Sequence, residues 1–190
     1  LEAEGLERGG LAFAVDKEEI GSAGATGAGS AFILNTLAEV LALEGADGEL
    51  ALRRAAANTN VISADVAAAL HPDWQEVQEK QNAARLGYGL ALTKYTGSRG
   101  KAGANDADAE YMGRVRRLLN GAEVPWQVAE LGRVDEGGGG TVARFLAAHG
   151  MHVVDAGPPL LGMHSPLELA AKCDIYAAYL GYRAFFERFL

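Results

Sequence analysis

The stretch VDKEEIGSAGATGAGS, residues 15–30, joins the end of an apolar run to a glycine-rich loop. The run LAFAV at 11–15 is typical of a buried strand, and residues 31–43 after the loop repeat apolar side chains at helical spacing. The order strand, loop, helix is that of an α/β protein. Glu18 and Glu19 follow the predicted strand directly, and strand ends are where open α/β sheets carry their sites.

Strands and helices alternate along the rest of the chain. The patterns predict further strands at 60–64, 90–95, 126–131 and 151–156, and further helices at 49–57, 107–119, 141–149 and 166–190. This order predicts a three-layer α/β/α architecture with a mixed sheet. With 190 residues, of which 49% are hydrophobic, the chain fits one domain with a continuous core.

The composition excludes several classes of partner. The formal net charge of -8, from 25 acidic against 17 basic residues, opposes binding to nucleic acid. The longest uncharged run of the C-terminal helix, residues 175–182, is too short to cross a membrane, so we expect no membrane partner. Cys173 is the one cysteine, which excludes an intrachain disulfide and favours the cytoplasm. The chain starts at Leu1 without a Met, and we expect a fragment of a longer protein.

Two more segments place polar side chains after apolar stretches. SADVAAALHP, residues 63–72, carries Asp65 at the end of a predicted strand, and LGMHS, residues 161–165, carries His164. Together with the Glu pair, these are the residue types that a metal-dependent hydrolase needs. The sequence therefore indicates a metal site.

Each of these residues also has a simpler interpretation. The Glu18–Glu19 pair fits a solvated acidic turn, although two adjacent anions are costly unless a cation neutralises them or one is protonated. Asp65 could be the N-cap of a helix that begins near residue 66. His164 lies before Ser165, an N-cap candidate for the last helix, and a lone His there is more often packed than bound to metal.

Other polar and glycine-rich positions are less specific. The four glycines at 137–140 match neither the P-loop nor the GxGxxG pattern, and we interpret them as a tight turn near a substrate pocket. Lys94 lies in a basic loop that could meet a substrate carboxylate or be solvated. His71, before Pro72, is typical of a surface turn.

Five segments, taken in order, resemble the aspartyl aminopeptidase and aminopeptidase I family of zinc metallopeptidases, above all its bacterial members. They are VDKEEIGSAGATGAGS, SADVAAALHP, KYTGSRGKAGANDADAEY, VDEGGGGTVARFLAAHG and VVDAGPPLLGMHSPLEL. The resemblance implies a phosphorylase/hydrolase-like catalytic domain with two zinc ions, which removes N-terminal residues from peptides. By motif, Glu18 resembles the general base, Glu19 and His164 resemble ligands of one zinc, and Asp65 resembles a ligand of the other.

Four residues are expected to contact the substrate. These residues are His71, Lys94, Gly139 and Gly140. Ala68 stands where many family members have a His, so the preferred N-terminal residue of the substrate could be acidic or neutral.

The resemblance further implies that residues 1–190 are the C-terminal part of the catalytic domain. An upstream segment, expected to lie outside the chain, supplies a His ligand and an Asp that bridges both metals, and a dimerisation domain is also expected to be absent. With three of five ligands, the chain alone should be nearly inactive. Complete members form large homo-oligomers. The alternatives are a non-catalytic scaffold or assembly fragment, and an amidase or deacetylase-type hydrolase with a similar metal centre.

Overall fold

A mixed four-stranded sheet forms the centre of the fold. The computed structural model describes residues 8–99, 102–133 and 135–189. The strand order across the sheet is β1 (Asn60–Ser63), β7 (His152–Gly157), β3 (Leu90–Thr93) and β6 (Trp126–Ala129). β1 is parallel to β7 and β3 is parallel to β6, whereas β7 and β3 are antiparallel. The predicted mixed sheet is confirmed.

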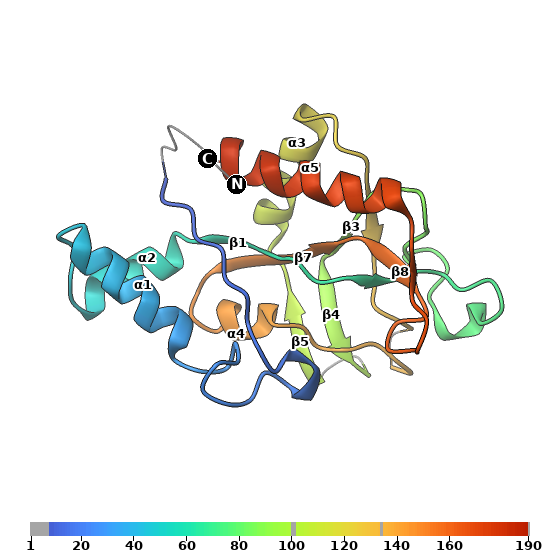
Figure 1. The fold of residues 1–190 in the computed structure, drawn as a ribbon, viewed down its shortest axis with the longest axis horizontal. Helices are drawn as coiled ribbons and strands as arrows, with labels where there is room; N and C mark the ends of the chain where they lie inside the picture. Colours follow the sequence, from blue (N-terminus) through green and yellow to red (C-terminus); the bar gives the residue numbers. More distant parts are fainter. Residues whose placement is uncertain (1–7, 100–101, 134, 190) are drawn as a thin grey trace.

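Helices cover both faces of this sheet, which gives the predicted three layers (Figure 1). On one face, α3 (Ala109–Gly121) and α5 (Lys172–Arg188) pack on alternate side chains of β3 and β7. On the other face, α4 (Ala143–Ala147), α1 (Phe32–Leu43) and α2 (Glu49–Ala57) pack around the remaining side chains of β1 and β7. The largest fully buried apolar side chains among the described residues are Tyr111, Leu90, Leu92, Leu119, Val115 and Val154. Because successive side chains of a strand point to opposite faces, the one sheet contributes to a hydrophobic core on each of its faces.

Two smaller sheets were not predicted from the sequence. β4 (Tyr95–Ser98) and β5 (Ala102–Asp106) form an antiparallel pair, so the predicted strand 90–95 divides at Lys94. A three-stranded sheet combines β2 (Ala67–Ala68), β8 (Pro159–Leu161) and β9 (Leu169–Ala170). Strands of two or three residues are too short to show a period, and β5 (AGAND) is made of residues depleted in strands.

The predicted strand at residues 11–15 is wrong. No strand in the described ranges pairs with the run, and the pairing nearby is one bridge between Asp16 and Gly27. Leu11 is 43% exposed. An apolar run becomes a strand when a neighbouring strand satisfies its backbone groups, and here it lacks that neighbour.

The last helix begins later than predicted. α5 starts at Lys172, because residues 166–171 include β9, where Leu169 pairs with Leu161. Ser165 is therefore not an N-cap; its hydroxyl donates to the carbonyl of Leu167 at 2.5 Å. Across the helices of the described ranges, none is both long enough and apolar enough to span a bilayer.

Asp174, in the first turn of α5, ties this helix to the start of β3. Its buried carboxylate accepts the backbone N–H groups of Gly87 and Gly89, each at 2.7 Å. Gly89 has a φ of 92°, and a Cβ atom there would lie 2.2 Å from the carbonyl oxygen of Pro125. The Asp174 carboxylate thus holds the turn at Gly87 and Gly89. This turn requires glycine at position 89, because it lies directly against the backbone of Pro125.

We predict that Asp174→Asn lowers the free energy of unfolding by about 2 kcal/mol. The Asn side chain has one acceptor oxygen, so its NH₂ group would face the second backbone N–H. Urea denaturation measures the change. Lys172→Ala, an exposed change in the same helical turn, is the matched control. Equal stability losses in the two variants would show that the Asp174 contacts contribute little.

Candidate metal centre

Glu18 and Glu19 lie in a single tight turn. The 3₁₀ turn η1 (Glu18–Ile20) is flanked by Lys17 and Gly21, whose φ angles are 64° and 87°. The N–H of Gly21 donates to the carbonyl of Glu18 at 2.9 Å, which closes the turn. Neighbouring side chains in such a turn point in different directions, so Glu18 is half-buried while Glu19 is exposed.

Asp65 follows β1, and its backbone lies directly against the end of β7. A Cβ atom at Gly157 would lie 1.8 Å from the carbonyl oxygen of Asp65, so this crossing requires glycine. The chain then continues into β2 and not into a helix. The N-cap interpretation of Asp65 is therefore wrong, and its half-buried carboxylate is available for another role.

His164 reaches Glu19 from the connection between β8 and β9. Gly162 and His164 have φ angles of 73° and 65°, and the N–H of Ser165 donates to the carbonyl of Gly162 at 2.8 Å. The imidazole Nε2 of His164 lies 3.0 Å from Oε2 of Glu19. Two residues from opposite ends of the chain thus meet through their side chains.

The spacing of these two donor atoms suits zinc. Two donors at about 2.0–2.1 Å from a tetrahedral zinc ion lie about 3.3 Å apart, and carboxylate oxygen and imidazole nitrogen are both common zinc ligands. Within the described residues, no group of three or more His, Cys, Asp or Glu side chains is arranged to hold a metal ion. The structure therefore supplies a matched pair of donors, fewer than the three or four of a complete site.

The carboxylates around this pair influence one another. Burial raises the pKa of Glu18, and the charges of Asp65 and Glu19 raise it further, while His164 lowers it. Burial and the charge of Glu19 also raise the pKa of Asp65, against the lowering effects of the Val66 N–H and His164. All four site residues indicated by the sequence thus share one electrostatic environment.

Sequence reasoning missed a further carboxylate, Asp155, which lies in the middle of β7. It pairs in register with Ser63 of β1 and Thr93 of β3, and its Oδ2 accepts the hydroxyl of Thr141 at 2.9 Å. Burial, together with the charges of Asp65 and Glu18, raises its pKa to about 7 even though the Ser63 and Thr141 hydroxyls lower it. An Asp within the apolar run MHVVDA was the sequence signal for it.

His71 and Lys94 have partners of their own. Nδ1 of His71 accepts the backbone N–H of Asp73 at 3.1 Å, and the Lys94 ammonium forms an ion pair with Asp106 of β5. In the part of the chain that the structure describes, neither side chain forms a hydrogen bond or ion pair with Glu19 or His164.

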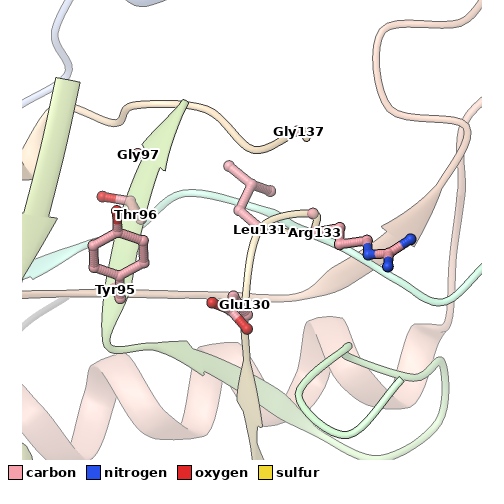
Figure 2. Close-up of a pocket in the computed structure, with 8 residues that line it drawn as sticks. Tyr95, Thr96, Gly97, Glu130, Leu131, Arg133 and Gly137 are labelled. Atoms are coloured by element: carbon pink, nitrogen blue, oxygen red, sulfur yellow. The ribbon is translucent and has the colours of Figure 1, made fainter. Parts of the chain in front are cut away.

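The four glycines at 137–140 run beside β4 without forming the expected tight turn themselves. The N–H of Gly97 donates to Gly139 and that of Arg99 donates to Gly137, both at 2.8 Å. A Cβ atom at Gly138 would lie 2.3 Å from the carbonyl oxygen of Gly97, so the close backbone approach requires glycine. Figure 2 shows the pocket lined by β4, Gly137 and the loop after β6, with the side chain of Arg133 directed away from Tyr95.

Comparison with known proteins places the chain in a family. The family described as aminopeptidase I zinc metalloprotease (M18) matches residues 6–186. The chain belongs to this family. It is 53% identical over 91% of its length to a probable M18 family aminopeptidase 1 of Thermotoga maritima, covering 39% of that protein. The corresponding protein of Clostridium acetobutylicum is 50% identical over 97% of the chain, which covers 40% of it.

The M18 fold is also seen in a solved structure. The crystal structure of the M18 aminopeptidase from Thermotoga maritima matches with a TM-score of 0.88 and 52% identity, over 92% of this chain and 39% of that one. This M18 chain thus spans about two fifths of the length of the relatives that it matches. A zinc metalloprotease needs oxygen and nitrogen donors, and the Glu19–His164 pair has one of each.

We predict that the metal-free chain loses stability as the pH rises, because the folded state binds a proton at Asp155 more tightly than the unfolded state does. The pKa of Asp155 is about 7 in the folded chain, against about 3.9 for an unfolded Asp. Its contribution to the free energy of unfolding therefore falls between about pH 4 and pH 7, by at most about 1.4 kcal/mol per pH unit.

Asp155→Asn keeps an acceptor for Thr141 and removes this titration. With a chelator present, wild type and variant should melt at similar temperatures near pH 4. Near pH 7.5 the wild type should melt several degrees lower than the variant, since each kcal/mol of lost stability lowers the melting temperature by about 2–4 °C. A melting difference that does not change with pH would contradict the assignment.

Proposed function

We propose that the complete protein is a zinc-dependent aminopeptidase that releases N-terminal residues from peptides. The observation that carries this proposal is the 3.0 Å contact between Glu19 and His164, with Glu18 next to it in the same turn. Membership of a zinc metalloprotease family supports it.

Three residues of this chain would hold two zinc ions. Glu19 and His164 would bind one ion, since their donor atoms already lie side by side at 3.0 Å, and Asp65 would bind the other. When bound, the ions would activate water as a nucleophile and polarise the scissile carbonyl. Burial, together with the nearby charges of Glu19 and Asp65, raises the pKa of Glu18, and burial with the charge of Glu19 raises that of Asp65, which supports a site built for cations.

Glu18 would act as the general base. It would take a proton from the attacking water and deliver that proton to the amine that leaves. A base in this role must hold a proton between the two transfers, and burial together with the neighbouring carboxylates raises the pKa of Glu18 in the required direction.

We further propose that residues 1–190 are the C-terminal part of the catalytic domain, and that an upstream segment supplies a His and a bridging Asp. The chain covers about two fifths of the length of its relatives, which supports a longer complete protein. The complete protein would act on peptides with an acidic or neutral first residue. His71, Lys94, Gly139 and Gly140 would contact that substrate.

The complete protein would also self-associate and work in the cytoplasm. Exposed aromatic and aliphatic side chains on α5, namely Ile175, Tyr176 and Tyr179, support an interface. The single cysteine suits a reducing compartment.

In the complete protein, we predict that Glu18→Gln lowers turnover by about 10²- to 10⁴-fold and leaves the zinc content unchanged, because Glu18 acts on water. Glu19→Gln is the matched comparison, since it should lower zinc content and activity together. Peptide hydrolysis is measured beside metal analysis of the same samples. Zinc loss in Glu18→Gln would mean that the roles of the two residues are exchanged or wrong.

For the chain of 190 residues alone, we predict little peptidase activity even with added zinc, because Glu19, Asp65 and His164 are fewer ligands than two zinc ions require. Adding the upstream coding segment should restore activity. An aminopeptidase assay on both proteins decides the point. Robust turnover by this chain alone would refute the incomplete site, and an inactive complete protein that still assembles would favour the scaffold alternative.

A further inference from the structure

His164 adopts an unusual backbone conformation. Its φ of 65° lies in the left-handed region, which non-glycine residues seldom occupy without support from their surroundings. This conformation sets the direction of the Cα–Cβ bond, and therefore decides whether the imidazole can reach Glu19. Packing does not hold the ring in place, because the side chain of His164 is 66% exposed and that of Glu19 is 72% exposed.

Glu168 supplies the missing support. Its Oε1 accepts the backbone N–H of His164 at 2.7 Å, a short bond to a charged acceptor. The pairing of Leu161 with Leu169 brings Glu168 back beside the turn. The hydroxyl of Ser165, bonded to the carbonyl of Leu167, holds the chain between the two residues.

We propose that Glu168 is a positioning residue, whose carboxylate holds the backbone of His164 in the conformation that directs the imidazole toward Glu19. This inference rests on the proposed role of His164 as a zinc ligand. Partners that fix a metal-binding His are known to matter for affinity, and here the contact is made to the backbone of that residue.

Two substitutions separate the hydrogen bond from the charge. Glu168→Gln keeps an oxygen acceptor of the same reach and removes the charge, whereas Glu168→Met keeps the length and removes the acceptor. Leu167→Ala, at an exposed neighbouring position, is the control for general disturbance of the turn. Thermal melts of all variants report whether each one folds.

The first measurement uses the 190-residue chain without metal. The imidazole nitrogen resonance of His164, assigned by its loss in His164→Asn, should move when Glu19→Gln is introduced, because the two side chains are in contact. The same shift should occur in the Glu168→Gln and Leu167→Ala backgrounds. It should be lost in the Glu168→Met background.

The second measurement uses the complete protein and titrates zinc directly. Glu168→Met should bind zinc about 10- to 100-fold more weakly, the usual effect of removing a residue that orients a ligand. Glu168→Gln should bind zinc as the wild type does.

The inference is overturned if Glu168→Met keeps both the resonance shift and the zinc affinity, or if Glu168→Gln is as damaging as Glu168→Met. A complete wild-type protein that neither binds zinc nor cleaves peptides would refute the proposed function instead. The resonance measurement would then still decide whether Glu168 positions His164, because it needs neither metal nor activity.

Discussion

Burial and mutual repulsion of four neighbouring carboxylates are the constraint on which the rest of the candidate site depends. Glu18, Glu19, Asp65 and Asp155 interact electrostatically, and His164 lowers the pKa of Glu18 and Asp65. A folded chain tolerates such a cluster when its members are protonated or when cations neutralise it. The second solution fits a family of zinc metalloproteases.

The cluster exists because irregular backbone segments bring its members together. The backbone of Asp65 passes so close to Gly157 that a side chain there would not fit. The turn at Glu18 is flanked by residues with left-handed backbone conformations, and His164 has such a conformation itself. Such conformations cost free energy and concentrate at functional sites, where surrounding contacts hold them. Here the contacts are the closely packed backbone at Gly157 and the hydrogen bond from His164 to Glu168.

The long periodic segments were predicted well from the sequence. The strands at β1, β3, β6 and β7 and helices α1 to α5 follow the predicted order, because each has a repeating apolar face that a sheet of this kind buries. Prediction failed at residues 11–15, 166–171 and 137–140. The conformation of each segment depends on whether another segment pairs with its backbone, and the local pattern carries no record of that partner.

The sequence by itself determined the fold class, the family resemblance and the identity of Glu18, Glu19, Asp65 and His164 as candidate site residues. Their chemistry and their positions after apolar stretches are visible without a structure. The tertiary structure alone decided that Asp155 is coupled electrostatically to Asp65 and Glu18, and that Glu168 holds His164. The reason is physical, since strand register decides which side chains share a face, and a hydrogen bond depends on two groups meeting in space.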